Sequence, residues 1–204
     1  MCGRYFFDLE IDEVVESFSI DESMIADVEK GEKHPGTEIP VILVKDGRRY
    51  LKTLYWGIKI NGKSVINARF ETADEKPIFK DLIAYSRCII PASSFYEWKA
   101  TGKTKDKMEI FRSDRSKIAL GGIYGKFKDE SGKERISVII LTVPASGSMS
   151  HIHHRMPLIV PKDLWDEWLD ASVLSSDETS IIQRVHNLAL DFKISSNIQQ
   201  ISFL

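Results

Sequence analysis

Cys2 directly follows the initiating Met1. A side chain this small at position 2 allows methionine aminopeptidase to remove Met1, leaving Cys2 with a free α-amine beside its thiol. Both groups react near neutral pH, because their ordinary pKa values are about 8 and about 8.5. Such a 1,2-aminothiol forms a Schiff base with an aldehyde, and the thiol then closes a thiazolidine ring. The position of Cys2 therefore allows carbonyl chemistry, whereas this feature taken alone favours a small second residue without a chemical role.

Three of the five histidines, His151, His153 and His154, lie within four residues. On a strand, His151 and His153 would share one face, a spacing that suits zinc, but further ligands would have to come from distant parts of the chain. We therefore expect no metal. A single histidine in acid–base chemistry is the preferred interpretation, and a structural role for all three is the alternative.

Glu97 stands in the aromatic run Phe95-Tyr96-Glu97-Trp98. A half-buried glutamate beside aromatic rings has a raised pKa, which suits a proton shuttle. The alternative is a glutamate facing solvent on an alternating strand, and the pattern alone favours this alternative. Asn67 and Arg69 lie two residues apart on a segment that we expect to be extended, so both side chains would face the same side and could hold a phosphate or sugar.

The periodicity of the first half predicts two helices and a hairpin that would carry these residues. A helical stripe covers residues 9–18, with Asp8 as the expected cap. Strands are expected at 39–44 and 50–56, joined by a turn at Asp46-Gly47. Pro77 opens a short helix that ends near residue 84.

The second half is mainly β. Strands are expected at residues 87–90, 95–99, 108–112, 118–127, 136–143 and 156–160, with a turn at 129–132 and a loop at 144–150. Amphipathic helices are expected at 161–169, and at 176–185 with Ser176 or Asp177 as cap. This pattern predicts an α+β fold in which peripheral helices surround a bent, barrel-like and mainly antiparallel sheet. We expect one domain over residues 1–204, with 171–204 packed on the part that bears the motifs.

Composition indicates an ordinary globular protein of 204 residues, with 28 basic and 30 acidic side chains. No apolar run is long enough for a membrane span, and the start of the chain does not have the pattern of a signal peptide. With two cysteines, we expect a cytoplasmic protein without a disulfide framework. Charge is uneven: residues 8–32 hold ten acids and one base, and residues 99–117 hold seven bases and three acids. From this feature alone, two solvated surface segments are the preferred interpretation, and a binding stripe is the alternative.

Six separated blocks, in this order, resemble one known family. They are Met1-Cys2-Gly3-Arg4; Trp56-Gly57; Asn67-Ala68-Arg69-Phe70-Glu71-Thr72; Lys76-Pro77-Ile78-Phe79; Arg87-Cys88-Ile89-Ile90-Pro91-Ala92 with Phe95-Tyr96-Glu97-Trp98-Lys99; and Ile152-His153-His154-Arg155-Met156-Pro157. The chain resembles the SOS response-associated peptidase (SRAP) family of abasic-site-processing proteins from residue 2 to about 170.

The resemblance implies that Cys2, after removal of Met1, captures the aldehyde of an abasic site in single-stranded DNA as a thiazolidine. Self-cleavage of Met1 and abasic-site lyase activity are possible side activities, and the family needs no cofactor. By motif match, Asn67 positions the N-terminus and the sugar, Glu97 moves protons, and His153 helps open the sugar and reverse the crosslink. The DNA contacts implied are Arg4, Trp56, Arg69 and Arg155, with Trp56 stacking where the base is missing. We expect a monomer that joins the nucleoid when bound to DNA.

Three segments depart from the family pattern: Ala92-Ser93-Ser94 before the aromatic run, His34-Pro35-Gly36-Thr37 near the start, and a short stretch after Trp56-Gly57 at 58–64. They put the preference for a DNA sequence or junction in question. Two other functions are open. One is a Cys–His peptidase that acts on other proteins through Cys2 and His153. The other is a non-covalent nucleic-acid-binding module that uses Trp56, Arg69 and the basic segment 99–117.

Overall fold

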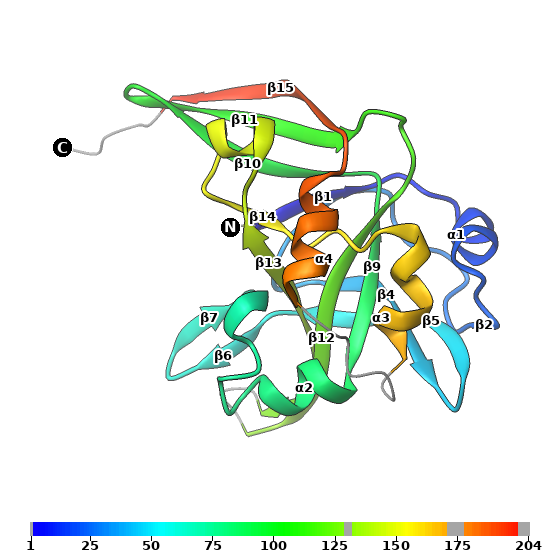
Figure 1. Ribbon diagram of the computed structural model, residues 1–204. Helices are drawn as coiled ribbons and strands as arrows, with labels where there is room; N and C mark the ends of the chain where they lie inside the picture. Colours follow the sequence, from blue (N-terminus) through cyan, green and yellow to red (C-terminus); the bar gives the residue numbers. More distant parts are fainter. Residues whose placement is uncertain (1, 129–131, 171–177, 200–204) are drawn as a thin grey trace.

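The computed structural model describes residues 2–128, 132–170 and 178–199, and five of its strands close into a barrel (Figure 1). Around the ring these strands are β4 (Glu38–Lys45), β5 (Arg48–Trp56), β13 (Glu134–Pro144), β12 (Ile118–Lys128) and β9 (Arg87–Ala92). A ring with an odd number of strands cannot alternate in direction throughout. One neighbouring pair must therefore be parallel; here it is β5 and β13, and the other four pairs are antiparallel.

Apolar side chains fill the barrel, and two glycines of β12 allow close packing against it. A Cβ on Gly122 would lie 2.6 Å from Cδ1 of Ile90, and a Cβ on Gly121 would lie 2.8 Å from Cδ2 of Leu158. Interiors at this density leave no space for an added methyl group. Much of the core is completely shielded from solvent, including Ile39, Ile42, Leu51, Ile89, Ile90, Ile139 and Ile140.

A second sheet carries the N-terminus. Its strands, in the order β15 (Leu190–Gln199), β11 (Thr104–Arg112), β10 (Ser94–Thr101), β1 (Arg4–Phe7) and β3 (Gly31–Lys33), are mutually antiparallel. Only Ser93 separates β9 of the barrel from β10, so the chain passes directly from one sheet into the other. The start of the chain is thereby held beside the barrel (Figure 1).

Short elements surround the two sheets. They are the strands β2 (Glu22–Ser23), β6 (Ile58–Ile60), β7 (Lys63–Val65), β8 (Asn67–Arg69) and β14 (Arg155–Pro157), the helices α1 (Ile11–Phe18), α2 (Lys80–Tyr85), α3 (Trp165–Leu169) and α4 (Glu178–His186), and the 3₁₀ turns η1 (Phe70–Thr72), η2 (Gly147–His151) and η3 (Lys162–Leu164). The predicted α+β class, with a bent, barrel-like, mainly antiparallel sheet and peripheral helices, is confirmed. No helix in the described ranges has the length and apolar character of a membrane span.

Local signals predicted most elements but missed several boundaries. The β4–β5 turn is confirmed, since Asp46 and Gly47 both have positive φ, at 50° and 73°. Helix α1 begins at Ile11 and its N-cap is Glu10 rather than Asp8, with the Glu10 amide donating to Oε2 of Glu13 at 3.1 Å. Helix α2 begins three residues later than expected.

Other differences from the expectations lie near the start of the chain and in its second half. Strands β1 and β3 were not expected, and the predicted loop at 144–150 contains most of η2. Helix α4 overlaps the predicted helix at 176–185 and ends one residue later, at His186. Both candidate caps, Ser176 and Asp177, fall outside the described residues, and so does most of the predicted turn at 129–132.

Candidate active site

The pairing of β1 with β10 brings Cys2 to Glu97. Arg4 lies opposite Tyr96 in this antiparallel pair, so the residues before Arg4 run past Glu97 and beyond. The Cys2 side chain is completely buried, and its Sγ lies 3.7 Å from the carbonyl oxygen of Arg4. Burial, and secondly the negative charge of Glu97, raise the pKa of the Cys2 thiol. The thiol is therefore protonated at neutral pH.

Glu97 is 2% exposed in the middle of β10, where it lies opposite Met108. The outward-facing alternative for this glutamate is wrong. Burial raises the pKa of Glu97, and the nearby His154 is among the groups that oppose this rise. A carboxyl group with a raised pKa can both donate and accept a proton near neutral pH.

The histidine segment does not form a strand. His151 ends the 3₁₀ turn η2 and His153 lies between this turn and β14, so the proposed shared strand face of the two residues is wrong. Among the described residues, no three histidine, cysteine or carboxylate side chains gather in a group that could hold a metal ion. Instead, the His153 and His154 rings pack together with centroids 4.3 Å apart.

His153 has a defined protonation state. Its Nδ1 lies 3.0 Å from both the amide nitrogen and the carbonyl oxygen of Arg155, contacts that require opposite roles of Nδ1. Burial lowers the pKa of His153, although the carbonyl contact opposes the shift, so the ring is neutral at pH 7. Which of the two Arg155 contacts is a hydrogen bond of Nδ1 depends on which ring nitrogen carries the proton.

Asn67 presents a buried acceptor. Strand β8 pairs with β13, and the Asn67 Nδ2 donates to the Ile140 carbonyl oxygen at 3.4 Å. Its Oδ1 is buried and has no hydrogen-bond partner among the residues that the structure describes. The preceding carbonyl, that of Ile66, accepts the Trp56 indole N–H at 3.1 Å, and the Trp56 ring lies 5.7 Å from that of Tyr5. Asn67 thus belongs to the packed region next to the N-terminal strand.

Trp56 does not have the exposure that stacking on DNA requires. Its side chain is completely buried and both its N–H and its ring are used within the protein. This burial does not favour the expectation that Trp56 fills the place of a missing base, which stays a prediction. The tryptophan instead supports the start of the chain by packing against Tyr5.

Arg155 is also committed inside the protein. Its guanidinium donates to both carboxylate oxygens of Glu71, at 2.5 and 2.8 Å, and to the Thr142 carbonyl oxygen at 2.6 Å. Although burial alone would raise the pKa of Glu71, the hydrogen bonds from Arg155 prevail and lower it. This pairing does not favour the predicted DNA contact through Arg155, because its charge is neutralised and its side chain is 9% exposed; the contact stays a prediction.

Arg155→Ala should lower the free energy of unfolding by about 3 kcal/mol, because it leaves a partly buried carboxylate without its partner. Chemical denaturation at pH 7 measures this loss. Arg69→Ala is the matched control, since Arg69 is exposed on β8 and should leave stability within about 0.5 kcal/mol. Equal stability of Arg155→Ala and the unaltered protein would contradict the structural role.

Two predicted phosphate contacts are accessible. Arg4 is half-exposed and its Nε lies 3.5 Å from a carboxylate oxygen of Glu32, and Arg69 is exposed near Glu71 and His154. Part of the basic segment 99–117 is paired, since Lys107 forms an ion pair with Glu32 and Arg112 with Asp114.

Sequence reasoning missed Tyr5. This residue is completely buried beside Cys2, and its hydroxyl has no hydrogen-bond partner within the described part of the chain. Burial, followed by the influence of Cys2, raises its pKa. The signal was present in the aromatic run Tyr5-Phe6-Phe7, which favours a strand with every second side chain inside.

The chain is similar to known proteins in sequence and in fold. The chain is 36% identical over 185 residues to "Abasic site processing protein YoqW" of Bacillus subtilis, covering 83% of this chain and 80% of that protein. It is 30% identical over 150 residues to "Abasic site processing protein YedK" of Escherichia coli, covering 72% and 67%. A crystal structure of a protein from Bacteroides thetaiotaomicron has the same fold, with a TM-score of 0.75 over 95% of this chain and 91% of that one, at 22% identity.

The sequence pattern of one family extends over nearly the whole chain. The match to "SOS response associated peptidase (SRAP)" covers residues 1–200, which include Cys2, Asn67, Glu97 and His153. The chain therefore belongs to the SOS response associated peptidase family.

Proposed function

We propose that this protein processes abasic sites in single-stranded DNA by covalent capture through Cys2, acting as a monomer without a cofactor. The names of its relatives support the substrate class. The observation that carries the proposal is the burial of the Cys2 thiol beside Glu97, a carboxyl group whose pKa burial raises. An N-terminal aminothiol with an adjacent proton donor is the combination that aldehyde capture requires.

The reaction begins after removal of Met1, when the Cys2 amine adds to the C1′ aldehyde of the ring-opened sugar. Glu97 donates a proton to the resulting hydroxyl, which leaves as water, and the C=N bond of a Schiff base forms. The thiol sulfur then adds to the same carbon, and the thiol proton passes to the nitrogen. One water is released in total, and the product is a thiazolidine.

Neighbouring residues have separate roles in this proposal. The buried Oδ1 of Asn67 accepts a hydrogen bond from the amine or a sugar hydroxyl, which fixes its approach to the aldehyde. His153, whose pKa burial lowers, assists the opening of the sugar ring and the reversal of the adduct. Arg4 and Arg69 contact flanking phosphates, which makes affinity fall with salt.

Two side activities belong to the same proposal. Hydrolysis of the Met1–Cys2 peptide bond by the protein itself would expose the amine without a separate aminopeptidase. The Schiff base also acidifies the 2′ protons of the sugar, so β-elimination of the 3′ phosphate competes with ring closure. The protein would then behave as an abasic-site lyase whenever the thiol is slow to add.

The environment of Cys2 argues against the Cys–His peptidase. That mechanism attacks with a thiolate, which requires a lowered thiol pKa, whereas burial and Glu97 raise the pKa of Cys2. A purely non-covalent binding module would not need a buried aminothiol beside a proton donor.

The deciding experiment mixes the protein, shown by mass spectrometry to begin at Cys2, with a single-stranded oligonucleotide that bears one abasic site. A band of protein joined to DNA that survives heating on a denaturing gel supports the proposal. If the processed protein yields no such band, covalent capture is wrong and plain binding explains the family resemblance better.

His153→Ala should slow reversal of the adduct about tenfold or more, because the ring supplies a positioned proton donor and acceptor. The measurement preforms the adduct, adds an excess of unlabelled abasic DNA, and follows release of the labelled strand. His151→Ala is the control, since His151 is an exposed histidine two residues away. If His153→Ala released the labelled strand at the rate of the unaltered protein, His153 would have no role in reversal of the adduct.

A further inference from the structure

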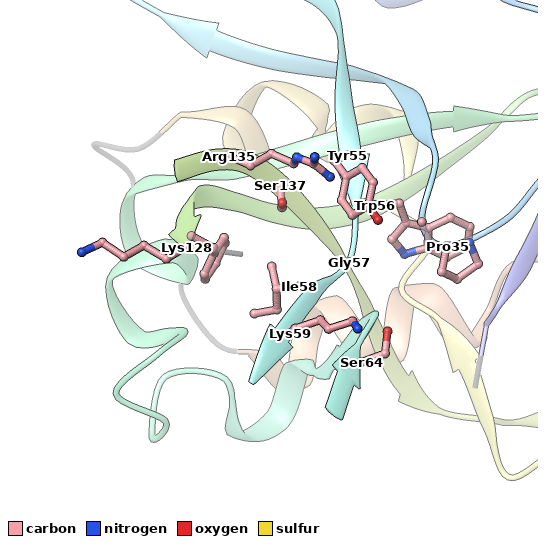
Figure 2. A pocket seen from close by; sticks show the side chains of 12 residues that line it. Pro35, Tyr55, Trp56, Gly57, Ile58, Lys59, Ser64, Lys128, Arg135 and Ser137 are labelled. Carbon is pink, nitrogen blue, oxygen red and sulfur yellow. The ribbon is translucent and has the colours of Figure 1, made fainter. Parts of the chain in front are cut away.

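A cavity of about 510 Å³ lies away from Cys2, between the end of β5, the β6–β7 hairpin and the open ends of β12 and β13. Figure 2 shows Arg135 and Tyr55 along one side of the cavity and Lys59 with Ser64 on the other, with Ile58 between them. Its size is that of sites that hold a small organic group. None of the groups assigned above to the chemistry lines it, apart from the structural Trp56.

The lining combines cationic, aromatic and apolar groups. The guanidinium of Arg135 lies over the Tyr55 ring, 4.2 Å from its centroid. Lys59 and Lys128 also line the cavity, although Figure 2 shows the Lys128 amine pointing outward. No carboxylate is among the described residues that line the cavity; Glu38, opposite Tyr55 on β4, accepts a hydrogen bond from Thr53 instead. This chemistry fits a flat, aromatic group that is attached to an anion.

Arg135 and Tyr55 form a preassembled stacking platform. A guanidinium that lies on an aromatic ring keeps its second planar face available, and nucleobases stack on such faces in single-stranded nucleic acids. The guanidinium also carries the charge that a neighbouring phosphate requires. One nucleotide, with its base on Arg135 and its phosphate near the cationic side chains, would use both the stacking surface and the positive charge of the lining.

The cavity lies near Asn67 along the chain and along β13. Gly57 lines it and has a φ of +103°, and Cγ2 of Ile66 lies 3.1 Å from the position of a Cβ on Gly57. Along β13, Ser137 lines the cavity and Ile140 contacts Asn67. These two residues are three apart, which is roughly 10 Å on a strand, so a nucleotide in the cavity would lie near, but not at, a sugar held by Asn67.

We infer that the Arg135–Tyr55 platform binds the base of a nucleotide that lies near the abasic site but not next to it, on one side of it. The inference rests on the proposed function for the identity of the strand. The short β6–β7 hairpin, which covers the segment 58–64, forms one wall of this base-binding site. A base that stacks on Arg135 inside the cavity cannot at the same time stay paired within a duplex, so the site selects single-stranded DNA on that side.

The test measures fluorescence anisotropy of an undamaged, labelled single-stranded oligonucleotide at fixed salt, using the full-length protein. Arg135→Ala should weaken binding about tenfold, the size expected when one stacked base is lost. Arg135→Lys should weaken it nearly as much, because lysine keeps the charge but not the planar face. The control is Arg48→Ala, since Arg48 is another exposed arginine over a tyrosine, 5.8 Å from the Tyr50 ring, and lies outside the cavity; it should change affinity less than twofold.

Unaltered DNA affinity of Arg135→Ala would overturn the inference. Unaltered affinity of Arg135→Lys would overturn it as well, because charge alone would then explain the contact, as expected for a phosphate rather than a stacked base. Adduct formation separates this inference from the proposed function. With abasic oligonucleotides trimmed to one nucleotide on each side, the unaltered protein should react as Arg135→Ala does, and only long flanks should distinguish them. If none of the proteins forms an adduct while the anisotropy pattern holds, the proposed function fails and the base-binding site stands.

Discussion

Cys2→Ala should abolish the heat-stable adduct with abasic DNA while non-covalent binding of the same strand stays within about twofold. The variant keeps an α-amine after Met1 is removed, because alanine is also a small second residue. It therefore still forms the Schiff base, but no sulfur is present to close the ring. The adduct is followed on a denaturing gel and the affinity by anisotropy with undamaged DNA.

Borohydride reduction makes this prediction sharper. Added during the reaction, it should trap Cys2→Ala on the DNA as a stable amine, whereas omission of the reductant should leave no adduct after heating. Strand cleavage should rise in this variant, since β-elimination no longer competes with ring closure. Cys88→Ala is the matched control: Cys88 is the other buried cysteine, on β9 of the barrel, and its loss should leave the adduct yield unchanged. A heat-stable adduct from Cys2→Ala without reductant would show that another nucleophile does the chemistry.

Features that depend on neighbouring residues could be predicted from the sequence. The Asp46-Gly47 turn needs two residues with positive φ, and this residue pair is one that commonly adopts that conformation. The burial of Glu97 did not follow in this way, because the alternating pattern alone favoured a side chain that faces solvent. The barrel class followed from many short strands, but the parallel contact between β5 and β13 depends on ring closure, which no local pattern contains.

Contacts between distant residues could not be predicted. Arg155 stands in a motif that implies DNA contact, but Glu71, 84 residues earlier, accepts hydrogen bonds from its Nη1 and Nη2. The motif around Trp56 implied an exposed ring, whereas the Ile66 carbonyl and Tyr5 contact its side chain inside the protein. The Arg135–Tyr55 pair joins residues 80 apart in number, and the β5–β13 contact brings them together. Motif resemblance named candidate residues, and only the tertiary structure shows which of their side chains are buried in internal contacts.

Glu97→Gln should slow adduct formation about 100-fold, because the amide keeps the shape of the side chain but cannot donate a proton to the leaving hydroxyl. The pH dependence identifies the group. The unaltered protein should show a bell-shaped profile, rising as the α-amine loses its proton and falling as Glu97 loses its own, at a pH above the ordinary carboxyl value. Glu97→Gln should lack the falling limb, so the ratio of the rate of the unaltered protein to that of the variant should shrink as pH rises.

The same substitution should make the protein more stable at neutral pH, and the sign follows from the raised pKa. A carboxyl group whose pKa is higher in the folded state binds its proton more tightly there, so stability is greatest below the ordinary pKa and declines as pH rises through the folded value. Glutamine removes that decline, so the variant's gain in melting temperature should be present at pH 7 and shrink toward pH 4. Glu109→Gln is the control: Glu109, on the adjacent strand β11, accepts a hydrogen bond from Ser94 and pairs with Lys193, and its loss should not slow capture. Slower capture together with higher stability is the result expected of a buried acid kept for chemistry, whereas a loss of both would mean that Glu97 serves the fold.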